Sequence, residues 1–192
     1  NAGAIVDRSA NLDWAVGRCV VGAFAYAGQV CISVQRILVH DDRFDEFVER
    51  FRAAASMLRL GDPLDPETDI GPMVDAKAAV RAQAWVDEAV AAGARVLLGG
   101  HADGTFFPPT ILADAPLDAK VCSEEAFAPV VVLARFSDFD AAMAQANDSR
   151  FGLQAGVFTN DLGNAFRAFD GLHVGGVILN DVAIQDITSY NK

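Results

Sequence analysis

The sequence predicts an α/β fold in three layers, in which helices cover both faces of a mostly parallel, twisted β-sheet. Short apolar runs that are typical of buried strands alternate with segments of ten or more residues that have helical periodicity. No internal repeat or linker composition divides the 192 residues, a length sufficient for one domain with a sizeable core. Alternation of this kind is typical of strand–helix–strand units, whose strands run parallel.

The first predicted helix lies before residue 28. Its apolar residues follow the spacing i, i+3, i+4, i+7 and i+11 of one buried stripe: Leu12, Ala15, Val16, Cys19 and Ala23. We expect Ser9 to cap this helix and Gly28 to end it. The apolar run at 34–39 then predicts a strand.

Two further helices are predicted, separated by a long connection. The second has its apolar stripe at Phe44, Phe47, Val48, Phe51, Ala55 and Leu58. Three prolines, two glycines and four acidic residues at 60–73 indicate a connection with little regular structure. The third helix is expected from about Asp75 to Ala92, and its predicted inward side chains are Ala79, Ala82, Val86, Ala89 and Val90.

The rest of the chain continues the alternation. We expect a short strand at 95–100, extended chain at 106–112, a strand at 130–136, a helix at 138–147, a strand at 154–158, a helix at 161–171 and a strand at 175–179.

Composition excludes several classes of function. The formal net charge of −11 repels phosphate backbones and anionic lipid, so we expect no nucleic-acid partner. The longest apolar stretches, such as 129–134, are too short to span a bilayer. Three widely spaced cysteines suit a reducing cytoplasm better than a disulfide framework. The three histidines are scattered, and we expect no metal site.

Cys31 is the candidate reactive residue, although position alone favours packing because free cysteine is among the most buried residue types. It stands where a helix and a short turn lead into a strand, and such junctions place side chains in clefts. Cys19, on the helix stripe, is expected in the core. Cys122 precedes two carboxylates, which would raise the pKa of its thiol and make it a poor nucleophile.

The segment AYAGQVCISVQRILVH at 25–40 resembles the nucleophile segment of aldehyde dehydrogenases, in which G-Q-x-C follows a helix and leads into R-x-x-V. Further blocks resemble the same family in the same order over nearly the whole chain: 61–75, 88–100, 106–112, 123–136, 156–169 and 175–181. One departure is Ala128, where the family usually has glycine.

The resemblance implies roles for particular residues. Cys31 would be the catalytic nucleophile, forming a thiohemiacetal and then a thioester, with its backbone N–H as an oxyanion donor. Glu125 would hold the ribose hydroxyls of NAD or NADP, and Phe127 would pack beside that cofactor. Gln29, in the nucleophile motif, and Asn180 would support the active site. The absence of G-x-G-x-x-G agrees with a family whose dinucleotide is held mainly by another domain.

The resemblance covers only the cysteine-bearing catalytic domain, at 1–185, while 186–192 does not look like the family and is expected to be a non-native or disordered tail. In the family a glutamate general base precedes the position of Asn1 by four residues. We therefore expect the parent protein, as a homo-oligomer, to oxidise a small aldehyde to a carboxylic acid, and this chain alone to be inactive. The alternatives are a CoA-acylating aldehyde dehydrogenase and a non-catalytic assembly domain.

Overall fold

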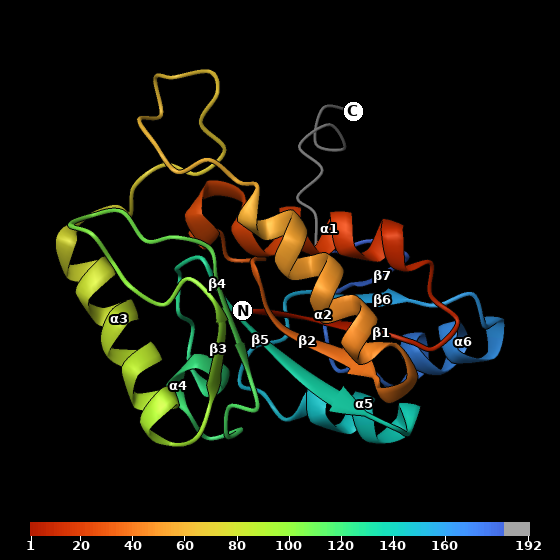
Figure 1. Ribbon diagram of the computed structural model, residues 1–192. Helices are drawn as coiled ribbons and strands as arrows, with labels where there is room; N and C mark the ends of the chain where they lie inside the picture. The colour runs from red at the N-terminus through yellow and green to blue at the C-terminus, as the bar shows by residue number, and fades with distance from the viewer. Residues whose placement is uncertain (183–192) are drawn as a thin grey trace.

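The computed structural model describes residues 1–182 and confirms the α/β class (Figure 1). Seven strands form one sheet: β1 (Ala2–Val6), β2 (Val34–His40), β3 (Arg95–Leu98), β4 (Thr110–Ala113), β5 (Val130–Phe136), β6 (Ala155–Phe158) and β7 (Val177–Leu179). Their order across the sheet is β3-β4-β5-β2-β1-β6-β7. Every neighbouring pair is parallel except β3 and β4 at one edge. The predicted tail at 186–192 lies outside the described residues.

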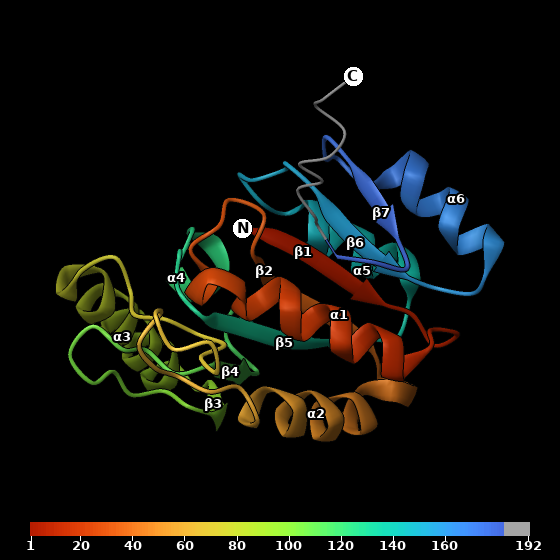
Figure 2. The same cartoon turned by 90° about the horizontal axis from the view of Figure 1, so that it is seen from above.

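The helices form layers on both faces of this sheet, as Figures 1 and 2 show. They are α1 (Leu12–Phe24), α2 (Asp41–Ser56), α3 (Ala76–Ala91), α4 (Lys120–Ser123), α5 (Phe139–Asn147) and α6 (Leu162–Gly171). Helices α1 and α2 lie along one face, whereas α5 and α6 lie on the other. The one-turn helix α4 is too short to show a helical period in the sequence and was not among the predicted helices.

Strand periodicity explains why there are two cores. Along β1, Ala4 and Val6 join the larger cluster with α1, α2 and α3, whereas Ile5 joins the smaller cluster with α5 and α6. Successive side chains on a strand point to opposite faces, so a strand covered on both sides is apolar throughout. Aromatic rings of α2 fill the larger core, where Phe47 and Phe51 stack with centroids 5.4 Å apart.

The start of α1 differs from the prediction. Asn11, not Ser9, is the N-cap, and its side chain accepts a hydrogen bond from the Trp14 backbone N–H. The Ser9 hydroxyl instead donates to the Asp7 carboxylate at 2.6 Å, because the chain between β1 and α1 still follows a turn at that point. Helix α1 ends at Phe24, and a short 3-10 segment, η1 (Ala25–Gly28), continues to the predicted end.

The buried face of α3 agrees with the prediction at all but one position. Ala79, Ala82, Val86 and Ala89 are buried as predicted, but Val90 is 42% exposed. Adjacent helical residues point about 100° apart, and with Ala89 fully buried the Val90 side chain lies at the border of the buried stripe, where it remains partly exposed. No helix among residues 1–182 combines the length and the apolar character needed to cross a bilayer.

Candidate active site

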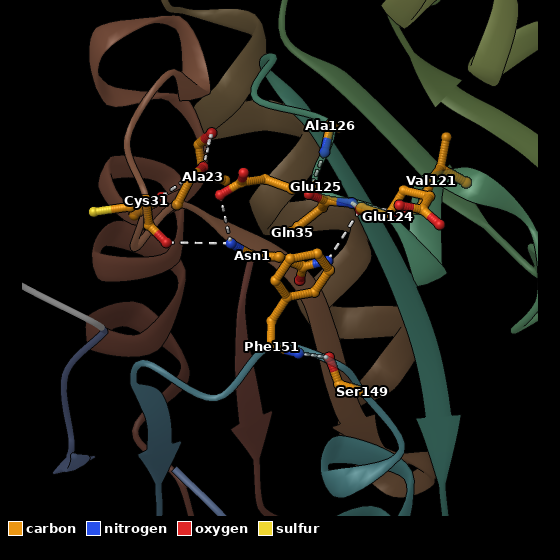
Figure 3. A network of polar contacts seen from close by, with 12 residues as sticks. Asn1, Ala23, Cys31, Gln35, Val121, Glu124, Glu125, Ala126, Ser149 and Phe151 are labelled. Carbon is orange, nitrogen blue, oxygen red and sulfur yellow. Dashed lines mark hydrogen bonds and ion pairs between the residues drawn. The ribbon is translucent and has the colours of Figure 1, made fainter. Parts of the chain in front are cut away.

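Three segments meet at one edge of the sheet. Asn1 precedes β1, the Cys31 turn precedes β2, and residues 124–129 precede β5. Because β5, β2 and β1 are parallel neighbours, their amino-terminal ends lie at the same edge. Strand pairing thus brings Cys31 and Glu125, which are 94 positions apart in sequence, into one network of contacts (Figure 3).

The turn that leads to Cys31 has an unusual backbone. Tyr26, Ala27 and Gly28 have φ values of +53°, +54° and +66°, so three successive residues are left-handed. Only glycine adopts this conformation without cost. Gly28 is also pressed against the segment before β5, since a Cβ at this position would lie 2.1 Å from the Ala128 carbonyl oxygen. The Cys31 turn and the Glu125 segment are therefore packed backbone to backbone.

Cys31 is exposed, and its thiol is free. Figure 3 shows its sulfur pointing away from Asn1, while its carbonyl oxygen accepts a hydrogen bond of 3.2 Å from the Asn1 backbone nitrogen. Within residues 1–182, the Cys31 backbone N–H donates to no backbone or side-chain acceptor. In such an arrangement the sulfur can attack a carbonyl carbon while the unused N–H donates a hydrogen bond to the carbonyl oxygen.

The other two cysteines are buried. Burial raises the pKa of the Cys19 thiol far above its usual range, in agreement with the expected core position. Burial also raises the pKa of Cys122 to about 11. The direction predicted for Cys122 is confirmed, but the predicted cause is wrong: desolvation dominates, and the contributing carboxylate is Asp118 rather than Glu124 or Glu125.

Glu125 and Phe127 line a pocket of about 320 Å³ beside the Cys31 turn. The other lining residues are Gln29, Val74, Ala78 and Arg81. The Glu125 side chain is 39% exposed and Phe127 is 38% exposed, so a carboxylate and an aromatic ring both face open space. A larger hollow of about 660 Å³ around Asp118 and Arg150 contains none of the predicted site residues.

The Asn1 backbone nitrogen lies 3.6 Å from Glu125 Oε1. The Asn1 side chain also donates to the Glu124 carbonyl at 3.1 Å. The start of β1 thus contacts both the Cys31 turn and the Glu125 segment.

Gln29 joins the Cys31 turn to the long connection at 60–75. Its Oε1 accepts from the Val74 N–H at 2.8 Å, and its Nε2 lies 3.5 Å from the Pro72 carbonyl oxygen. These contacts use the side chain on the wall of the pocket and leave it away from the thiol. The supporting role expected for Gln29 stays a prediction.

The structure does not bring Asn180 to this cluster. Asn180 follows β7, and because β7 is parallel to β6 and β1 it lies at the opposite, carboxyl-terminal edge of the sheet. Its side chain accepts from the Thr159 N–H at 3.0 Å, and its φ of +55° turns the chain after β7. Asn180 therefore lies apart from the Cys31 and Glu125 cluster, and its supporting role stays a prediction.

Sequence reasoning missed Gln35, a buried polar residue in an otherwise apolar strand. Its amide makes three hydrogen bonds to the segment 121–126, which Figure 3 shows side by side with β2. The sequence does carry a sign of this contact, because Gln35 interrupts the apolar run VQRILV. A polar side chain on a buried strand needs a hydrogen-bond partner. Ala128 is buried and does not have a positive φ, so the family's usual glycine is not required there.

No group of three or more His, Cys, Asp or Glu side chains within residues 1–182 is arranged to hold a metal ion. The chemistry available in the described part of the chain is that of a thiol, a carboxylate, an aromatic ring and backbone N–H groups. These are the components of nucleophilic covalent catalysis next to a binding pocket.

The α/β sheet, with a free cysteine and a glutamate brought together at one edge, agrees with one family of enzymes. The sequence model of the aldehyde dehydrogenase family matches residues 1–191, and the chain belongs to that family.

Individual relatives agree with this assignment. The chain is 45% identical over 183 residues to 3-sulfolactaldehyde dehydrogenase of Priestia aryabhattai, covering 95% of this chain and 38% of that protein. It is 42% identical over 192 residues to the NADP⁺ succinate-semialdehyde dehydrogenase GabD of Escherichia coli K12, covering 95% of this chain and 40% of that protein. The crystal structure of aldehyde dehydrogenase 21 from Physcomitrella patens, in complex with the reaction product succinate, superposes with a TM-score of 0.94 at 44% identity, over 96% of this chain and 39% of that one. The chain thus spans about two fifths of the length of the relatives it matches.

Proposed function

We propose that this chain is the cysteine-bearing catalytic part of an NAD(P)-dependent aldehyde dehydrogenase that oxidises a small aldehyde to a carboxylic acid. The observation that carries the proposal is the exposed Cys31 thiol, on a turn whose Gln29 lines the same pocket as Glu125 and Phe127, in a chain of this family. The names of the relatives cover aldehydes from sulfolactaldehyde to vanillin, so the proposal concerns the aldehyde group that they share.

Cys31 is the proposed nucleophile. Its thiolate forms a bond to the aldehyde carbon while the carbonyl π electrons move to oxygen, which gives a thiohemiacetal oxyanion. The unused Cys31 N–H can donate to that oxygen without breaking an existing bond of the protein. One such donor contributes roughly 10²–10³ in rate.

Glu125 and Phe127 are the proposed cofactor residues, and their geometry fits the role. A half-exposed carboxylate can accept hydrogen bonds from both hydroxyls of a ribose, and the neighbouring ring offers an apolar surface at the wall of the pocket. When bound, the nicotinamide supplies the hydride acceptor that turns a thiohemiacetal into a thioester. The Glu125 segment, placed beside Cys31 by β5 and β2, would fix where that ring lies.

The isolated chain is proposed to be inactive, and the parent to act as a homo-oligomer. The support for inactivity is that the relatives are more than twice as long as this chain, so most of a complete dehydrogenase is not contained in it. Hydrolysis of the thioester needs a base that activates water, which is worth roughly 10²–10⁴ in rate. The resemblance places that base outside this chain. Mixing the 192-residue chain with an aldehyde and NAD⁺ or NADP⁺ should give no NADH or NADPH; rapid formation would contradict this part of the proposal.

The role of Cys31 is tested in the full-length protein. Cys31→Ser should lower aldehyde-dependent NADH or NADPH formation by about 10³-fold or more, because an alcohol is a far weaker nucleophile than a thiolate. Cys122→Ala is the control, since that thiol is buried and its pKa is raised. Iodoacetamide should alkylate Cys31 in the wild-type protein and leave Cys19 and Cys122 unmodified. Unchanged oxidation by Cys31→Ser would refute the proposal and favour an assembly domain, and product release that requires CoA would favour the acylating alternative.

A further inference from the structure

The segment that carries Glu125 and Phe127 has a strained backbone. Phe127 has a φ of +48°, in the left-handed region that a residue with a side chain avoids. Such a conformation persists only where surrounding contacts determine it, and it is often found where a ligand is held.

The peptide groups around Ala126 are held from both sides. The Ala126 N–H donates to Gln35 Oε1 at 3.0 Å, and the Ala126 carbonyl accepts from Arg81 Nη2 at 2.9 Å. Gln35 lies on β2 and Arg81 on α3, so two separate elements grip one residue. This residue stands between Glu125 and Phe127, the two proposed cofactor residues.

Gln35 makes the larger share of these contacts. Its Nε2 donates to the Glu124 carbonyl at 2.7 Å and to the Val121 carbonyl at 2.8 Å, in addition to the contact at Ala126 (Figure 3). The residue is only 4% exposed, so water cannot readily take the place of its amide. The side chain thus uses its acceptor and both donors on a single segment.

The place of Gln35 in the chain gives this clamp a consequence for function. Gln35 stands four residues after Cys31, on the strand into which the Cys31 turn leads. We propose that Gln35 is a positioning residue that holds Glu125 and Phe127 in place relative to Cys31 before the nicotinamide cofactor binds. This inference rests on the proposed function, because it assigns the held segment to the cofactor.

The chain offers a matched control in Gln83. Its Nε2 donates to the Gly100 carbonyl at 2.8 Å, and its Oε1 accepts from the Ala102 N–H at 2.8 Å. Gln83 therefore also grips a loop through both its acceptor and its donors, although it is half-buried and its Nε2 also donates to Asp87 Oδ1 at 2.8 Å. The loop at 100–102 does not line the pocket. If Gln35 acted only on stability, its loss would, like the loss of Gln83, leave the dissociation constant of the cofactor unchanged.

The test uses the full-length protein and isothermal titration with NAD⁺ and with NADP⁺. Gln35→Met keeps the length of the side chain and removes its amide, so the dissociation constant of the cofactor should rise by about tenfold or more. The rate at which iodoacetamide alkylates Cys31 without cofactor should not change. Gln83→Met should lower the melting temperature and leave the cofactor dissociation constant unchanged. Unchanged cofactor affinity in Gln35→Met, or an equal loss in Gln83→Met, would overturn the inference.

A second measurement covers the case in which Gln35→Met does not fold. Hydrogen exchange of the cofactor-free wild-type protein should show the Ala126 amide as strongly protected as the amides within β5. Fast exchange at Ala126 would mean that the segment is not held before binding and would overturn the inference. If the wild-type protein binds neither NAD⁺ nor NADP⁺, the proposed function fails, and the exchange result still decides whether Gln35 orders this segment.

Discussion

The contact between the Cys31 turn and the Glu125 segment depends on the absence of a side chain at Gly28, and Gly28→Ala tests this dependence. The added Cβ would lie 2.1 Å from the Ala128 carbonyl oxygen and 2.9 Å from the Pro129 nitrogen. These are backbone atoms, which cannot rotate away. The left-handed φ of +66° adds a cost of about 1 kcal/mol for any residue with a Cβ, and forced overlap in a packed region typically adds about 1–3 kcal/mol. We therefore expect Gly28→Ala to lower the free energy of unfolding by about 2–4 kcal/mol.

Gly104→Ala separates the two contributions. Gly104 has a nearly equal φ of +59°, but no atom lies within 4 Å of the position its Cβ would occupy. Gly104→Ala should therefore lower the free energy of unfolding only by the cost of the left-handed backbone, about 1 kcal/mol. Urea unfolding of both variants gives the comparison, and alkylation of Cys31 reports whether the turn has moved. Equal destabilisation in the two variants would refute the argument that Gly28 is needed for close approach.

Two further predictions concern the opposite edge of the sheet. Burial acts to raise the pKa of Asp7, but hydrogen bonds from Ser9 and Thr159 outweigh it, and the pKa is lowered below its usual value of 3.8. The carboxylate therefore stabilises the fold above about pH 4, and this contribution is lost as the pH falls through the lowered pKa. Asp7→Asn should lower the free energy of unfolding by about 2 kcal/mol at neutral pH and should make the melting temperature fall less steeply on acidification. A fall as steep as that of the wild type would exclude Asp7 as its source. Asn180→Ala removes the acceptor for the Thr159 N–H and should lower the free energy of unfolding by about 1–2 kcal/mol. The alkylation rate of Cys31 should not change. A large change in that rate would show that the two edges of the sheet are coupled.

Local sequence was sufficient for the class of fold and for most elements. The stripe of Phe44, Phe47 and Phe51 on α2 and the apolar run of β2 both lie where their periodicity predicts. Periodicity works because the local backbone geometry of a helix or strand fixes which side chains share one face. The apolar residues of the sequence then mark the face that is buried. It failed at Val90 and at the cap of α1, where the precise orientation or the first turn of the backbone decides the outcome.

The candidate site could be predicted only in part. Family motifs singled out Cys31, Glu125, Phe127 and Gln29, and the structure places all four around one pocket and its adjoining turn. The motif that singled out Asn180 could not say which end of the sheet it would occupy. That depends on the direction of β7 relative to β2, which is a property of the whole sheet.

By itself the sequence determined which segments are strands and helices, which faces they bury, and to which family the chain belongs. Only the tertiary structure decided that β5 lies next to β2, so that a segment 94 positions along the chain packs against the Cys31 turn. It also decided that the amide of Gln35 finds its three partners there. The physical reason is that strand pairing and side-chain hydrogen bonds join residues far apart in sequence, whereas propensity and periodicity act over a few turns of one element.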